Sequence, residues 1–95
     1  MFVNILSFKI NKKDGITSNE LSMVEDNIAS KPEGLDRYHI FKDKKKENKY
    51  YLIEYWNSIK SKDKMEKSSK YQYLNKIHRI SNEKNYKKIE CDVVI

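Results

Sequence analysis

The first ten residues form the segment that most constrains the fold of this chain. Apolar side chains occupy both sets of alternating positions, with Phe2, Leu6, Phe8 and Ile10 on one face and Val3 and Ile5 on the other. Because successive side chains of a strand point to opposite faces, this pattern predicts a strand that is buried on both sides. The rest of the chain must therefore supply two covers for this strand, or a second molecule must supply one.

The next segments predict a helix and a hairpin. A capping box and apolar residues at helical spacing predict a helix over residues 17–30, which ends at the Lys31-Pro32-Glu33-Gly34 segment. Strands follow over residues 35–42 and 49–57, and a polar connection joins them as a hairpin.

The last third of the chain predicts one more helix and one more strand. Helical spacing resumes at Lys60, and Ser68-Ser69 divides this helical region into two pieces. Strict alternation over residues 88–95 predicts a final strand, with Ile89, Cys91, Val93 and Ile95 on one face.

The resulting order is β-α-β-β-α-β, which is typical of a ferredoxin-like α+β fold. We expect one domain over residues 1–95, with a four-stranded antiparallel sheet and both helices on one face. The opposite face of the first and third strands is apolar, and exposing a sheet of that size would be a liability in a monomer. Sheet-to-sheet pairing into a homodimer is the simplest way to cover it.

Composition argues against several classes of partner and cofactor. The formal charge is +6, but only two of the 20 basic residues are Arg, which indicates a Lys-rich composition rather than a surface selected for nucleic acid. Two His and one Cys do not form a metal-binding pattern, and neither Gly stands in a Gly-rich phosphate loop. No membrane-spanning segment or export leader is recognised. We expect a cytoplasmic protein without a cofactor, a metal, a nucleic acid or a membrane as partner.

Three short segments are similar to domains of the antibiotic biosynthesis monooxygenase (ABM) family. They are Glu33-Gly34, residues 51–56 (YLIEYW) and residues 68–74 (SSKYQYL). The resemblance spans nearly the whole chain and implies a dimeric α/β barrel with a small-molecule pocket between sheet and helices. It also implies a cofactor-independent monooxygenase acting on or binding a small aromatic or quinone-like compound. Because one fold hosts many activities, a non-catalytic small-molecule-binding or stress-associated dimer stays open as the alternative.

The haem-degrading branch of this family is disfavoured by the residues at three positions. That branch uses an Asn on the first strand and a Trp and a His in the second helical region. By position these roles fall on Ser7, Met65 and Asn75, none of which matches. These three residues remain candidates for lining a substrate pocket.

Two histidines are the candidate catalytic residues. His39 lies in the second strand, and His78 flanks the apolar stripe of the second helical region. An imidazole titrates near neutral pH and could deprotonate a phenol as a general base. A structural role for each histidine is the alternative interpretation.

Four further residues are candidates for binding the substrate. Trp56 shares a strand face with Glu54, a carboxylate among apolar neighbours that has to be paired or have a raised pKa if it is buried. Tyr38 and Tyr71 could stack on a planar ligand or hydrogen-bond to it. Core packing and a structural ion pair are the alternatives for these side chains.

RNA binding is a third functional hypothesis, because RNA-recognition domains share the same order of elements. Such domains place aromatic residues beside Gly on the third strand. The corresponding segment, Lys49-Tyr50-Tyr51-Leu52-Ile53-Glu54, contains no Gly and carries an acidic residue. The sequence therefore argues against RNA binding.

Overall fold

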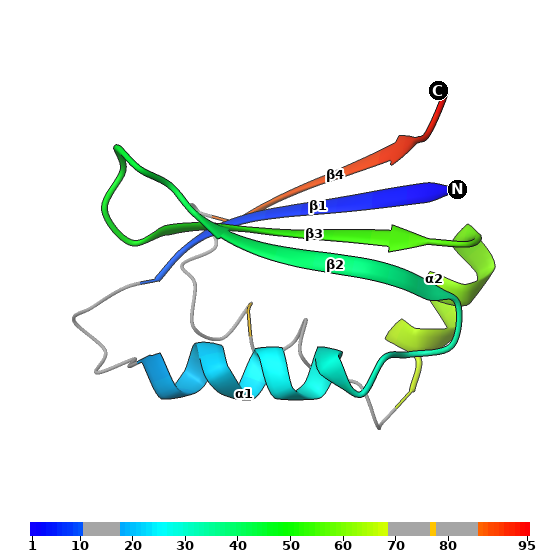
Figure 1. The fold of residues 1–95 in the computed structure, drawn as a ribbon, viewed down its shortest axis with the longest axis horizontal. Coiled ribbons are helices and arrows are strands. Elements are labelled where there is room, and N and C mark those ends of the chain that lie inside the picture. The colour runs from blue at the N-terminus through cyan, green and yellow to red at the C-terminus, as the bar shows by residue number, and fades with distance from the viewer. Residues whose placement is uncertain (11–17, 69–76, 78–85) are drawn as a thin grey trace.

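The computed structural model describes residues 1–10, 18–68, 77 and 86–95, and it confirms the ferredoxin-like order (Figure 1). Six elements follow one another along the chain: β1 (Phe2–Lys9), α1 (Ser18–Ala29), β2 (Leu35–Lys42), β3 (Lys49–Trp56), α2 (Ile59–Glu66) and β4 (Lys87–Asp92). The predicted continuation of the second helix beyond Ser68 lies outside the described residues, apart from Ile77. None of the described helices is long and apolar enough to span a bilayer.

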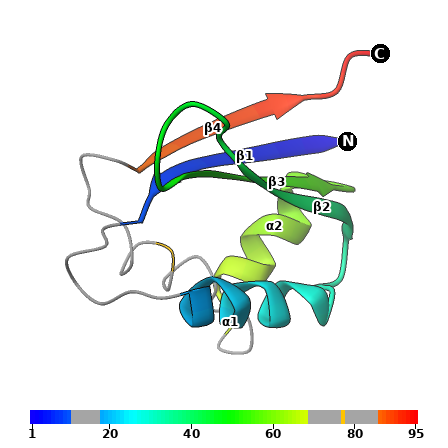
Figure 2. The same cartoon turned by 60° about the vertical axis from the view of Figure 1, so that its left-hand side comes forward.

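The four strands form one antiparallel sheet in the order β2-β3-β1-β4. Both helices lie on the same side of this sheet, as Figures 1 and 2 show from two directions. The sheet therefore has an inner face, which the helices cover, and an outer face. β1 and β3 occupy its centre, so residues on these two strands are the best shielded from solvent.

The hairpin between β2 and β3 is held by one aspartate. Asp43 Oδ1 accepts hydrogen bonds from the backbone N–H groups of Lys45 and Lys46 at 2.8 and 2.9 Å. The Tyr51 hydroxyl donates to Asp43 Oδ2 at 2.6 Å. This Tyr51 hydrogen bond and the two backbone bonds lower the pKa of Asp43 to about 2. The ionised carboxylate thus closes the turn that sets the register of the hairpin.

The connection between β3 and α2 is fixed by a serine cap and a close glycine contact. Ser58 adopts an extended conformation before the helix, and its Oγ accepts a hydrogen bond from the Ser61 N–H at 3.3 Å. Gly34 lies against the Ser61 side chain with a φ of +88°. A Cβ at this position would collide with Ser61, so only Gly lets the chain entering β2 pass so close to α2.

The hydrophobic core lies between the inner face of the sheet and the helices. The register places Leu6 of β1 opposite Leu52 of β3, and Phe2 opposite Trp56. Leu6, Leu52 and Trp56 have no solvent exposure. Helix residues complete this layer: Val24 and Ile28 from α1, Met65 from α2, and Ile77.

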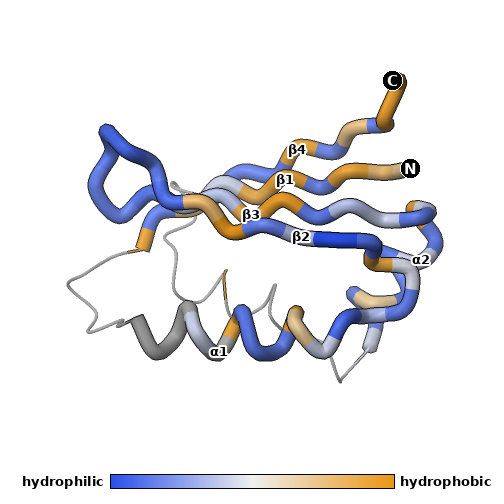
Figure 3. The backbone as a smooth tube through the Cα atoms, viewed as in Figure 1, coloured by the Kyte–Doolittle hydropathy of each residue, from blue (hydrophilic) through white to orange (hydrophobic). Residues whose placement is uncertain are grey.

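The outer face of the sheet is largely apolar, as the alternation of β1 predicts. Its apolar side chains are Val3 and Ile5 on β1, Phe41 on β2, Ile53 and Tyr55 on β3, and Ile89 and Cys91 on β4, and the polar side chains of Ser7, Arg37 and His39 lie among them. The hydropathy colouring shows apolar residues along these strands (Figure 3). Phe41 is 48% exposed and Ile89 is 53% exposed. Both described helices lie on the opposite side, so no described helix covers this face, and its exposed hydrophobic side chains lie on the edge strands β2 and β4.

Candidate functional site

A buried polar pair lies at the centre of the inner face. Asn4 of β1 and Glu54 of β3 are cross-strand partners, and both have no solvent exposure. The Asn4 Nδ2 group donates a hydrogen bond of 2.8 Å to Glu54 Oε1. A side-chain amide and a carboxylate are costly to bury in an apolar core, so a hydrophobic residue at each position would suit stability better. The two side chains satisfy part of each other's hydrogen-bonding capacity inside the core.

One polar atom of this pair and one of Trp56 are also buried. Within the part of the chain that the structure describes, neither Asn4 Oδ1 nor Trp56 Nε1 has a hydrogen-bond partner. Each such atom costs about 1–3 kcal/mol relative to a satisfied one. We refer to Asn4 Oδ1 and Trp56 Nε1 as the donor–acceptor pair. One acceptor and one donor are thus presented from the same face of adjacent strands.

Tyr86 places a phenol close enough to Glu54 for the two side chains to interact electrostatically. Its side chain is half-buried and packs against the core. Burial raises the pKa of Tyr86, and the nearby carboxylates of Glu54 and Glu66 raise it further. Tyr86 therefore remains a neutral phenol at physiological pH, and its O–H can act as a donor.

An ionic cluster joins α2 to the edge strand β4 beside this interior site. Lys62 is only 2% exposed, and its Nζ lies 2.9 Å from Glu66 and 3.2 Å from Glu90. Lys88 Nζ lies 2.9 Å from Glu90 and 4.0 Å from Glu66. Burial lowers the pKa of Lys62, but the bonds to Glu66 and Glu90 outweigh burial, so the net shift is upward. Lys62 is therefore a fixed positive charge, and its Nζ lies 5.6 Å from the centre of the Phe2 ring.

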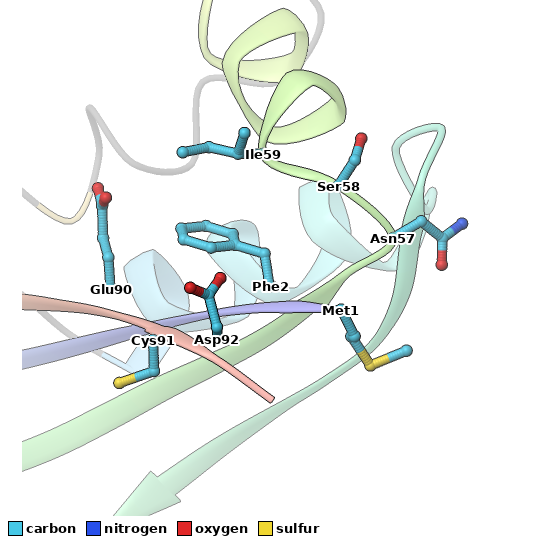
Figure 4. Close-up of a pocket in the computed structure, with 8 residues that line it drawn as sticks. All are labelled: Met1, Phe2, Asn57, Ser58, Ile59, Glu90, Cys91 and Asp92. Atoms are coloured by element: carbon cyan, nitrogen blue, oxygen red, sulfur yellow. The ribbon is translucent and has the colours of Figure 1, made fainter. Parts of the chain in front are cut away.

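A groove of about 400 Å³ opens at the end of the sheet where β1 begins and β4 ends (Figure 4). The Phe2 ring, the Ile59 side chain and the carboxylates of Glu90 and Asp92 gather around it, whereas Cys91 and Asn57 point away. Phe2 also belongs to the buried core and faces Trp56 across the strands. Its ring thus lies between this groove and the interior polar site.

The structure brings several of the predicted site residues together. Glu54 and Trp56 lie on the inner face beside Asn4, and Met65 is buried in the same core. Tyr38 pairs with Glu54 in the register and packs against this core while half-buried. These four residues lie in the layer between sheet and helices, where the family resemblance predicts a pocket, and none of them lines the groove at the end of the sheet.

Other predicted residues are placed elsewhere. Ser7 pairs with Tyr51 on the outer face, so it does not reach Glu54. His39 also lies on the outer face and is exposed; its ring centre is 5.5 Å from that of Phe41. It contributes to a second groove of about 440 Å³ along β2.

Three predicted residues, Tyr71, Asn75 and His78, lie outside the described residues.

Sequence reasoning missed Asn4, Lys62 and Tyr86. The signal for Asn4 was present, because it interrupts an apolar run on the same strand face as Phe2 and Leu6. Lys62 is followed by Glu66 one helical turn later, which is the spacing of an ion pair on a helix surface. That pattern does not show burial, since the cover comes from β4, which is distant in sequence.

Comparison with known proteins supports the fold at low sequence identity. No family model and no curated protein matches this sequence. A crystal structure of an antibiotic biosynthesis monooxygenase superposes with a TM-score of 0.78 at 15% identity and covers 100% of both chains. A mutant form of SnoaB, a cofactor-independent oxygenase from Streptomyces nogalater, superposes with a TM-score of 0.79 at 13% identity, and the match covers 97% of this chain and 91% of the SnoaB chain. A protein from Mycobacterium tuberculosis superposes with a TM-score of 0.79 at 13% identity, and the match covers 99% of this chain and 95% of that protein.

Proposed function

We propose that this chain, which has the fold of the antibiotic biosynthesis monooxygenases, is a cofactor-independent monooxygenase-like protein for a small aromatic or quinone-like compound. The observation that carries the proposal is the buried polar group of Asn4, Glu54 and Trp56 on the inner face, with its donor–acceptor pair. Apolar neighbours such as Leu6 and Met65 suit an aromatic ring, and the polar atoms suit its oxygens.

The chemistry needs a base, an anion-stabilising donor and a dry site. A base removes the proton of a substrate phenol, and the electron-rich phenolate reacts with O₂. One oxygen atom enters the ring, which becomes a quinone, and the other leaves as water. Glu54 is the buried carboxylate nearest to the donor–acceptor pair and serves as the base in this scheme, while Trp56 Nε1 and the Tyr86 hydroxyl stabilise the anion. His78, proposed as a base from the sequence, is the alternative.

Oxygen consumption tests this activity. Purified protein is incubated with naphthols and anthrones in an oxygen electrode, and quinone formation is followed by absorbance. We expect Glu54→Gln to lower any turnover by about 100-fold or more, because general-base catalysis contributes that much. His39→Ala is the matched control and should leave turnover unchanged, since His39 lies on the outer face. No oxygen uptake above that of buffer with any substrate contradicts the enzymatic proposal.

A binding protein without turnover is the second candidate, and the same interior site supports it. The donor–acceptor pair can hold an oxygenated aromatic molecule whether or not a reaction follows. Ligand binding that survives Glu54→Gln, in the absence of oxygen uptake by the unmodified protein, favours this function over the first. A location in the cytoplasm forms part of both proposals and is compatible with the single, exposed Cys91.

We infer that two copies of this chain pair through their outer faces. Exposed Phe41 and Ile89 stand at opposite edges of an apolar surface that crosses the whole sheet, and a second sheet of the same kind would cover it. Analytical ultracentrifugation should show a dimer that Phe41→Asp converts to a monomer. Lys44→Asp, an exposed change of charge in the hairpin turn, is the control and should remain dimeric. A monomeric unmodified protein at all concentrations contradicts this assembly.

A further inference from the structure

We propose that Lys9, Lys49 and Lys87 form a binding site for a diphosphate group on the outer face of the sheet. The site lies at the end of the sheet that carries the β2–β3 hairpin, away from the two chain termini (Figure 1). We refer to these three residues as the lysine triad. The inference goes beyond the proposed function, because it needs neither an aromatic ligand nor oxygen.

The strand register brings the triad together. Lys9 of β1 is the direct cross-strand partner of Lys49 of β3. Such partners project from the same face, with their Cβ atoms about 4.5–5.5 Å apart. On the other side of β1, Lys87 of β4 is paired with Ser7, which is two residues before Lys9 and shares its face. Three flexible, positively charged side chains therefore start from adjoining positions on the outer face.

The triad lacks a counter-charge of its own. Like charges directly opposite each other on a sheet are destabilising. Within the part of the chain that the structure describes, no carboxylate forms an ion pair with a member of the triad. None of the outward-facing residues of β1, β3 and β4 is acidic. By contrast, Lys88, which follows Lys87 and points to the inner face, lies 2.9 Å from Glu90.

The electrostatics of Lys49 show that these charges act on one another. Lys49 is half-buried. Burial lowers its pKa, and the charges of Lys46 and of the other two members of the triad lower the pKa further. Asp43 acts in the opposite direction, but its two oxygens already accept hydrogen bonds from the turn and from a tyrosine. An anion among these ammonium groups would relieve their repulsion.

A diphosphate matches the chemistry of this surface. A lysine ammonium binds phosphate as a compact charge with three donors on a flexible stem. A single phosphate ester carries about −1.5 to −2 charges near pH 7, which is less than the charge of the triad, and a second linked phosphate supplies the difference. The Ser7 hydroxyl can donate to a phosphate oxygen. Phe41, the exposed cross-strand partner of Tyr51 on the same face, can contact the organic part of a diphosphate ester.

The test is an NMR titration of the unmodified full chain with inorganic pyrophosphate at low ionic strength, in which the side-chain signals of the lysines are followed. We expect the signals of the triad to shift together along one saturable curve. The signal of Lys64, which is exposed on α2 on the other side of the sheet, should stay in place. Inorganic phosphate should bind about fivefold more weakly than pyrophosphate.

The same titration with ADP distinguishes two sources of the diphosphate group. Tighter binding of ADP than of pyrophosphate indicates that the site holds a diphosphate ester, with its organic part against the apolar surface beside the triad. Tighter binding of pyrophosphate indicates that the site holds the free anion. Both results support a diphosphate site at the triad.

A matched pair of variants separates the triad from the general charge of the protein. Lys49→Met and Lys64→Met remove one positive charge each and keep most of the apolar stem. Lys49→Met should weaken pyrophosphate binding by about fivefold, whereas Lys64→Met should change it by less than about twofold.

Three results would overturn the site. Equal weakening in Lys49→Met and Lys64→Met, or equal shifts of the Lys64 signal and the triad signals, would show that the net charge of +6 attracts anions without a defined site. A titration of the triad signals that does not saturate would also overturn it. The shifts are measured on the unmodified protein, so they do not depend on the folding of any variant.

Discussion

Replacement of Lys62 by Met tests whether the buried ionic cluster holds α2 against the sheet. Met keeps most of the apolar stem but removes the ammonium group, which lies between Glu66 at 2.9 Å and Glu90 at 3.2 Å. The change thus leaves the packing of Met65 and Phe2 largely in place while it removes the charge that joins α2 to β4.

The magnitude follows from the exposure of the partners. Removing one member of a fully buried ion pair costs about 3–5 kcal/mol because the other charge is left uncompensated. Here the side chains of Glu66 and Glu90 are 31% and 41% exposed, so water can solvate them, and Lys88 stays 2.9 Å from Glu90. We therefore expect Lys62→Met to lower the free energy of unfolding by about 1–3 kcal/mol.

The assay is urea denaturation followed by the fluorescence of Trp56, the only tryptophan, at one fixed protein concentration. Lys64→Met is the matched control, because Lys64 is 79% exposed and lies 3.6 Å from Glu33, which is 89% exposed. This control should change the free energy of unfolding by less than about 0.5 kcal/mol. If Lys62→Met and Lys64→Met lower the free energy of unfolding equally, or if Lys62→Met does not lower it, the buried ionic cluster does not hold α2 against the sheet.

The pH dependence gives a second measurement on the same variant. The pKa of Glu90 is lowered in the folded state by its bonds to Lys88 and then Lys62. A depressed carboxyl pKa contributes stability above the unfolded-state value of 4.5, and this contribution is lost as pH falls through the folded-state pKa. Lys62→Met should therefore flatten the acid side of the stability profile. If the free energy of unfolding of Lys62→Met falls with pH as steeply as that of the unmodified protein below about pH 5, the bond between Lys62 and Glu90 is not the source of the acid dependence.

Three other variants test separate parts of the structure. Gly34→Ala places a Cβ against Ser61 at a φ of +88°, so urea denaturation should show a loss of about 1–2 kcal/mol or more; unchanged stability contradicts the close contact. Asp43→Asn should lower the raised pKa of Tyr51 in a spectrophotometric titration and remove acid destabilisation of the hairpin between about pH 4 and pH 2; an unchanged tyrosine titration argues against the bond. Met65→Ala should cost about 2–5 kcal/mol through the cavity it leaves, and a smaller loss indicates that the core collapses around it.

The fold could be predicted because hydrophobic periodicity marks each strand and the first helix directly. The final strand shows the limit of such patterns. Alternation predicts a strand to Ile95, but β4 ends at Asp92 because its partner strand begins at Phe2, the residue that pairs with Asp92. Val93 then makes one hydrogen bond to the Met1 carbonyl and pairing stops. The length of a strand depends on its neighbour as well as on its own sequence.

His39 shows why the candidate site could be predicted only in part. Sequence alternation places His39 on the same face of its strand as Leu35, which is buried on the inner face. A register irregularity between Leu35 and Arg37 reverses the alternation, so Arg37 and His39 point to the outer face. Glu54 and Trp56 lie on regular β3, where no such shift intervenes. A bulge of one residue therefore decides which side chains of β2 point to the inner face, and the local hydrophobic pattern does not predict this bulge.

The pairing of β1 with β4 has a consequence for how the chain is made. β1 leaves the ribosome before the other strands, whereas β4, which covers one of its edges, leaves after them. Contacts between distant segments form slowly because a long loop must close first. Until β4 arrives, nascent β1 has an open edge and Lys62 lacks its Glu90 partner. Early chains thus carry an apolar strand open to β-addition, and shielding by a chaperone would matter most during this interval.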